Sequence, residues 1–215
     1  MTYATLQADV ASWLQRDDMT ATIQTCVRYA TAAFNRELAI DPVPEMESRD
    51  TRELTAEYSG LPADFLRMRA VVRDDGKELL YVTSQQMDEM EASGVSVEPQ
   101  VYTMEDLQLR VYPAPTALSP VTVTISSYEK IPSLSAGSDT NWLLSSHPDL
   151  YLWGTLLQAR AWLHDDARLK QVVEPAYTAG ILQLKRRVLT TPGMRSVLTH
   201  DIPAQRYAYD ISRGY

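Results

Sequence analysis

Few residues in this chain are of types that do chemistry, and those few are scattered. The three histidines are His147, His164 and His200, and the one compact group of potential metal ligands is His164-Asp165-Asp166. None of the histidines has a further ligand at the short, regular spacing that zinc sites use. Asp is a preferred residue at helix N-termini, so we interpret this group as a corner between two helices. We expect no metal and no cofactor.

Two pairs of neighbouring carboxylates are the remaining candidates for acid–base chemistry, namely Glu105-Asp106 and Asp74-Asp75. Both pairs lie between strand-like segments, where Asp is favoured by turn geometry, so we interpret them as turns. The sequence has no glycine-rich phosphate loop, no GxSxG and no HExxH motif. A small muralytic hydrolase, whose carboxylates meet only in the folded protein, is an alternative. We nevertheless expect no enzymatic activity.

The side chains that most often anchor interfaces are concentrated in residues 194–215. This segment follows Pro192-Gly193, which ends a helix, and it has no steady helical or strand period. Tyr and Arg, which recur along it, are enriched at the centres of protein interfaces. We therefore predict an extended arm that becomes ordered on another chain. Its predicted contact residues are Arg195, Val197, Leu198, Ile202, Arg206, Tyr207, Tyr209 and Arg213.

Charge is divided unevenly along the sequence. The chain of 215 residues has a net charge of -8, yet residues 185–215 contain six basic and two acidic residues, a net +4, which leaves residues 1–184 at -12. This division predicts an acidic body with a basic arm. The body would repel nucleic acid, whereas the arm would suit an acidic protein surface.

The rest of the composition is ordinary for a globular protein, with 45% hydrophobic and 22% charged residues. The longest apolar run, residues 150–157, is far shorter than the roughly 20 residues of a membrane helix. No basic segment precedes an apolar run at the start, so we expect no secretory signal. The single cysteine, Cys26, excludes an internal disulfide and fits a reducing compartment. We expect it to be buried.

The first forty residues predict two helices. Apolar residues recur three and four positions apart in residues 2–14 and again in residues 20–38. Thr2 or Thr5 is the expected cap of the first helix, and Thr20 that of the second. A segment with two prolines follows and ends the second helix, because proline cannot continue one.

The middle of the chain predicts a small antiparallel β region. Residues 46–58 are polar with weak alternation, which fits an exposed strand or a loop that crosses to a neighbour. In residues 66–72 the even-numbered positions are apolar, which predicts a strand with one buried face. Asp74-Asp75-Gly76 should turn this strand into a hairpin with residues 77–82. Residues 121–128 predict a further strand.

Between these strands the sequence predicts a helix and a second hairpin. Thr83 is the expected cap of a short acidic helix, which Gly94 should close. Residues 102–112 predict the hairpin, with Glu105-Asp106 as its turn.

Two more helices are predicted after a loop over residues 131–146. Pro148 suits the first position of one helix, which is apolar on most sides and should be the central, buried helix. The other runs to about residue 189, and Pro175 should kink it or restart it.

Together these elements predict an α+β fold. Helices at about residues 2–40 and 147–189 form a helical bundle, with a small antiparallel β region inserted at about 46–128. We expect residues 1–193 to form one body and residues 194–215 to form the extended C-terminal arm.

Six segments resemble the landmarks of a known family. They are LPADFLRMRAV at 61–71, LRVYPAP at 109–115, YEKIPSLS at 128–135, TNWLL at 140–144, PDLYLWG at 148–154 and HDDARL at 164–169. In order and spacing, from about residue 61 to 181, they are similar to the head-to-tail adaptor (connector) family of tailed phages. Pro175 and the arm depart from the family pattern.

The resemblance implies a structural virion protein that forms a ring, dodecameric in this family, below the portal. Such a ring would extend the DNA channel and join head to tail, with the portal ring and the tail nozzle or another tail protein as partners. It implies passage of genomic DNA without sequence-specific binding, no membrane, and assembly in the host cytoplasm. The arm is then expected to bind the portal. A cytoplasmic interaction domain unrelated to virions is a further alternative.

Overall fold

The computed structural model describes residues 1–94, 99–163 and 169–190. Its helices, in chain order, are α1 (Tyr3–Leu14), α2 (Thr20–Leu38), η1 (Pro44–Met46), α3 (Ser84–Ser93), α4 (Trp142–Ser146), α5 (Pro148–Ala159), η2 (Arg160–Trp162), η3 (Leu169–Val173) and α6 (Glu174–Thr190). Its strands are β1 (Glu47–Leu54), β2 (Tyr58–Gly60), β3 (Phe65–Arg73), β4 (Leu80–Tyr81), β5 (Val101–Glu105), β6 (Gln108–Tyr112) and β7 (Val121–Glu129).

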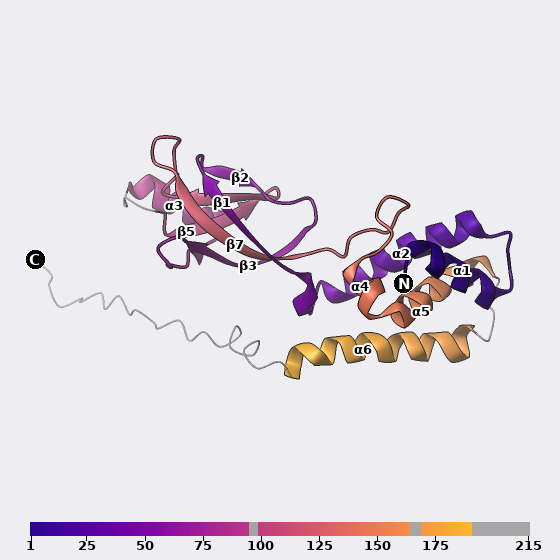
Figure 1. Cartoon of the computed structure of the whole chain (residues 1–215). Helices are drawn as coiled ribbons and strands as arrows, with labels where there is room; N and C mark the ends of the chain where they lie inside the picture. Colours follow the sequence, from indigo (N-terminus) through magenta and orange to yellow (C-terminus); the bar gives the residue numbers. More distant parts are fainter. Residues whose placement is uncertain (95–98, 164–168, 191–215) are drawn as a thin grey trace, which may run out of the picture.

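Figure 1 shows an elongated molecule with two parts. The helical lobe consists of α1, α2, α4, α5 and α6, so it draws on both ends of the chain. The β unit, residues 47–129, contains the strands and α3, and it is inserted between α2 and α4. In the helical lobe, α6 lies along one side of the other helices, with its C-terminal end nearer the β unit. The predicted α+β fold, with a β region inserted into a helical bundle, is confirmed.

Local capping decides where α1 begins, whereas packing decides where α2 begins. Thr2 caps α1 through a reciprocal pair of hydrogen bonds with Thr5. The prediction that Thr20 caps α2 is wrong, because Thr20 is the first helical residue and Met19 precedes it without a side-chain cap. Met19 is buried in the core of the helical lobe. Burial of this apolar side chain therefore fixes the start of the helix.

The central helix of the helical lobe is α5, as predicted, and it packs against α1, α2, α4 and α6. Its Tyr151 is fully buried and lies edge-on to Phe34 of α2, with ring centroids 5.1 Å apart. Tyr177 of α6 stacks on the same Phe34 ring at 5.9 Å. Gly154 makes this approach possible, since a Cβ there would lie 2.5 Å from Phe34 Cζ. Three helices thus meet at one aromatic side chain.

Within the described residues, the strands form a three-stranded sheet in the order β1-β7-β3 and a four-stranded sheet in the order β2-β6-β5-β4. Neighbouring strands are antiparallel except β4 and β5, which are parallel. Both sheets contribute to a hydrophobic core that is separate from the core of the helical lobe. Its buried residues are Leu54, Val71, Leu79, Tyr102, Leu109, Val111, Val123 and Ile125.

The predicted hairpin after β3 needs two corrections. Register irregularities interrupt the regular alternation of β3, so Val71 is fully buried where the alternation had favoured Val72. The turn is present, with Gly76 at a φ of 82°. The returning chain, however, makes only a short pairing with β3 through Glu78, and β4 then joins the other sheet beside β5. Of residues 46–58, the stretch Glu47–Leu54 forms the predicted exposed strand, β1, which ends in the buried Leu54, and Tyr58 begins β2.

The second hairpin and the short helix are confirmed. The turn of this hairpin is formed by Asp106 and Leu107, one residue later than the predicted Glu105-Asp106. These two residues have φ values of 47° and 59°, the pattern of a type I′ turn. Thr83 caps α3 through a capping box with Gln86, and Gly94 ends the helix at a φ of 68°.

The predicted loop over residues 131–146 contains a short helix, α4, so this part of the prediction is wrong. Asn141 starts α4 by accepting a hydrogen bond from the Leu144 N–H at 2.9 Å. Further along the chain, Pro175 falls in the first turn of α6, directly after the π-helical turn η3. This confirms that the last helix restarts there, where proline is tolerated.

Replacing Gly154 with Ala should destabilise the protein, because the added methyl group has no space beside Phe34. Overpacking a tight core costs about 1–3 kcal/mol, and the better helix propensity of Ala offsets at most ~1 kcal/mol. Urea denaturation should therefore give a lower free energy of unfolding. Gly137→Ala is the control, since a Cβ at Gly137 meets nothing within 4 Å. A Gly154→Ala variant as stable as the wild type would contradict the close packing of α2 on α5.

Candidate functional site

The residues that the sequence pointed to as chemical candidates do not form a reactive centre in the described part of the chain. No group of three or more His, Cys, Asp or Glu side chains there is arranged to hold a metal ion. His164-Asp165-Asp166 lies outside the described residues. Asp75 lies in its predicted turn and accepts a hydrogen bond from the Lys77 N–H at 3.2 Å. Of the described helices, none is both long and apolar enough to cross a membrane.

The predicted contact residues of the arm also lie outside the described residues. They are Arg195, Val197, Leu198, Ile202, Arg206, Tyr207, Tyr209 and Arg213. Cys26, in contrast, is fully buried in α2, as predicted. Burial raises the pKa of its thiol, which disfavours the reactive thiolate.

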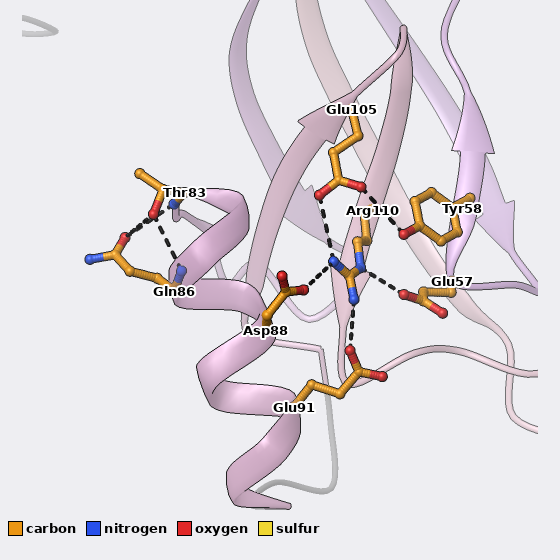
Figure 2. Close-up of polar contacts among 8 residues, drawn as sticks. All are labelled: Glu57, Tyr58, Thr83, Gln86, Asp88, Glu91, Glu105 and Arg110. Carbon is orange, nitrogen blue, oxygen red and sulfur yellow. Dashed lines mark hydrogen bonds and ion pairs between the residues drawn. The ribbon is translucent and has the colours of Figure 1, made fainter.

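The most concentrated group of charges in the described residues surrounds Arg110 on β6. The Arg110 side chain is only 9% exposed, and its three guanidinium nitrogens all face carboxylates (Figure 2). Nε donates to Glu57 at 2.6 Å, Nη1 to Asp88 at 2.8 Å and Nη2 to Glu91 at 2.7 Å. Glu105 lies 3.5 Å from Nη1. We call these five residues the Arg110 cluster.

Four separate parts of the β unit supply the Arg110 cluster. Asp88 and Glu91 come from α3, three positions apart and hence on one face of the helix. Glu57 precedes β2, and Glu105 ends β5 next to the hairpin turn. Tyr58 of β2 adds its ring, whose centroid lies 5.6 Å from the Arg110 Cζ, a cation–π distance. Its hydroxyl also donates to Glu105 at 3.3 Å (Figure 2).

The Arg110 cluster works as an electrostatic clasp. Hydrogen bonding to Asp88 is the main reason why the pKa of Arg110 is raised further above its already high value, so this side chain stays charged and cannot exchange a proton in catalysis. The carboxylates differ in exposure, from 31% for Glu105 to 67% for Asp88. Because α3 buries Met87 and little else, the bonds to Arg110 are a principal attachment of this helix to the sheet.

The Arg110 cluster was not predicted from the sequence, although the sequence contains a signal for it. Arg110 is the only basic residue between Lys77 and Lys130, a stretch that contains eight acidic residues. A lone cation among so many carboxylates is expected to collect them. The interpretation of Glu105-Asp106 as a turn was right for Asp106 and incomplete for Glu105, whose side chain joins the cluster.

The fold and the cluster together define the class of this protein. It is an α+β protein in which a helical lobe carries an inserted, acidic β unit. The Arg110 cluster serves to hold this β unit together. Among known families, the one described as SU10 adaptor protein matches residues 1–197. The chain therefore belongs to the SU10 adaptor protein family, a family of phage head-to-tail adaptors. This confirms the resemblance carried by residues 61–181.

Family membership supports a structural role in the phage particle, with contacts to portal and tail proteins. None of the curated proteins matches the chain.

Replacing Arg110 with Met should weaken the β unit, because Glu57, Asp88, Glu91 and Glu105 would then repel one another without a cation between them. Loss of one partner of a fully buried ion pair costs about 3–5 kcal/mol. Since Asp88 and Glu91 are largely solvated, we expect a smaller loss of about 1–3 kcal/mol in urea denaturation. The loss should shrink at about 1 M salt, which screens the repulsion.

Hydrogen exchange should show where the Arg110→Met variant loosens, and we expect the fastest new exchange in α3. Arg49→Met, on the exposed face of β1, removes the same charge and should change stability by no more than about 0.5 kcal/mol. Equal stability of the two variants would contradict the role of the cluster as a clasp.

Proposed function

We propose that this adaptor forms a dodecameric ring below the portal, extends the DNA channel and joins the phage head to the tail. The observation that carries the proposal is the family match over residues 1–197. The Arg110 cluster is consistent with a structural role without catalysis. Its four carboxylates are paired with Arg110 and serve to hold the β unit together.

The charge of the chain supports passage of DNA without binding. The β unit alone contains fifteen acidic and seven basic residues, a net charge of -8. Proteins hold DNA by placing Lys and Arg against phosphates, which releases counterions. A channel lined by this acidic chain would offer few such contacts, so the genome would slide through it without sequence-specific binding.

We assign attachment to the portal to the arm, residues 194–215. Its arginines, Arg195, Arg206 and Arg213, suit acidic groups on the portal, and its tyrosines and aliphatic residues suit apolar sites. We propose that the arm becomes ordered on the portal, because its sequence has no steady helical or strand period with which to form a core of its own. Coupling that order to the portal would place each adaptor copy beside its neighbours and raise their effective concentration.

Deleting the chain after Pro192 should abolish binding to the portal and leave the thermal melt unchanged. The deletion removes no part of α1 to α6, while buried aromatic anchors are each worth ~2 kcal/mol or more on truncation. A portal pull-down beside a melt measures both effects. Replacing the three arginines with Gln should weaken binding and its salt dependence, and replacing them with Lys is the control. Unchanged binding by the truncated chain would contradict this assignment and would move the portal contact to another surface, with α6 as the next candidate.

The purified chain should be monomeric or nearly so and should form rings when the portal is added. The exposed residues of β1 are polar or charged, namely Glu47, Arg49, Thr51 and Glu53, and charged edge strands disfavour unprompted pairing. Mass photometry with and without portal measures the outcome. Stable rings formed by the chain alone would contradict assembly on a portal template.

A further inference from the structure

The loop between β6 and β7 presents a leucine to solvent. Leu118 is 99% exposed and lies with Ala117 at the tip of a tight turn. Thr116 and Ser119 close this turn by two backbone hydrogen bonds, of 3.2 and 3.0 Å. The Thr116 hydroxyl accepts a third bond from the Ser119 N–H at 3.2 Å. In Figure 1 the loop extends from the start of β7, at the end of the β unit away from the helical lobe.

The loop is built to hold its tip in one conformation. Pro113, Pro115 and Pro120 fix the backbone on both sides of the turn, and Pro115 is buried against the β unit. A contact loop that is already ordered loses little conformational freedom when it binds. A single exposed leucine is common on protein surfaces and means little by itself. A leucine at the apex of a braced turn is a more specific feature.

The loop itself is free of charge, although Arg73 and Asp74 at the neighbouring end of β3 line a hollow together with Pro113, Pro115 and Thr116. Residues 111–128 contain no Asp, Glu, Lys or Arg, although the β unit as a whole carries fifteen acidic and seven basic residues. A neutral, apolar tip on an acidic unit does not suit nucleic acid, which requires basic contacts. It suits an uncharged apolar pocket on another protein, the kind of site in which a buried aliphatic anchor contributes to affinity.

We propose that Leu118 anchors the adaptor to the tail by entering an uncharged, apolar pocket on a tail protein. This inference rests on the proposed function, which assigns the arm to the portal and leaves the β unit available for the tail. The loop supplies the rigid shape, and the leucine supplies the apolar surface that the pocket buries. Because a ring repeats the loop in every copy, even a modest contact per copy would hold the tail firmly.

The test uses the phage with its adaptor gene deleted and the full-length adaptor supplied in trans. Leu118→Asn removes the apolar side chain without adding charge, and Leu118→Met keeps it apolar. Leu107→Asn is the matched control, since Leu107 is also an exposed leucine of the β unit and Asn tolerates its positive φ. Electron microscopy counts tailed and tailless DNA-filled heads, and immunoblots of the heads measure bound adaptor.

With Leu118→Asn, heads should retain the adaptor while tailed particles fall about tenfold or more. Leu118→Met and Leu107→Asn should match the wild type, and all purified variants should melt as the wild type does, because these side chains are solvated. Normal tailing with Leu118→Asn would overturn the proposal. Loss of the Leu118→Asn adaptor from heads would also overturn it, by assigning the loop to the portal or to a neighbouring copy. Wild-type heads without adaptor would instead refute the proposed function.

Discussion

The hydroxyl group of Tyr151 holds together three helices of the helical lobe, α2, α4 and α5. It lies in the core, where burial raises its pKa and keeps it neutral. Asn141 donates to it at 3.0 Å, and it meets the Thr31 hydroxyl at 2.8 Å. Since Thr31 gives its own proton to the Val27 carbonyl, Tyr151 must be the donor to Thr31. One unbroken series of hydrogen bonds therefore joins α2, α5 and the start of α4.

Polar side chains also fix the segment that returns from the β unit to α4. Asn35 of α2 accepts from the Ile131 N–H at 2.8 Å and donates to the Ile131 carbonyl at 3.4 Å. Its side-chain amide thus pairs with both backbone groups of Ile131, as a neighbouring β-strand would. Asn141 donates a second bond to the Pro132 carbonyl at 2.8 Å. In the helical lobe these fixed points are neutral, whereas the β unit relies on the charge of Arg110. Neutral groups suit the dry core, whereas the buried Arg110 cation is matched by carboxylates that are themselves partly exposed to solvent.

Local signals in the sequence were enough for the elements whose ends are set locally. The Thr83 cap and Gly94 define α3 within ten residues, and the periodicity of α2 and α5 gave the bundle. The remaining features depend on contacts distant in sequence. A five-residue helix such as α4 is too short to show a period, and the register shifts of β3 arise in its pairing with β7, which is distant in sequence. Arg110 contacts Glu57 and Asp88 only once the sheet and α3 have formed. Its position as the one basic residue in an acidic stretch was nevertheless visible in the sequence.

The way in which the β unit is attached has a mechanical consequence. β1 leaves the helical lobe and β7 returns to it as neighbours, paired from Glu47 with Tyr128 to Leu54 with Val121. The ion pair of Arg69 on β3 with Glu47 on β1 crosses β7, which lies between these two strands. A single linker would let the two parts swivel, but here two connections start from paired strands, and the returning one is fixed to α2 through Asn35 and Ile131, so together they oppose rotation. Torque applied to the β unit is therefore passed to the helices rather than lost in rotation at the joint.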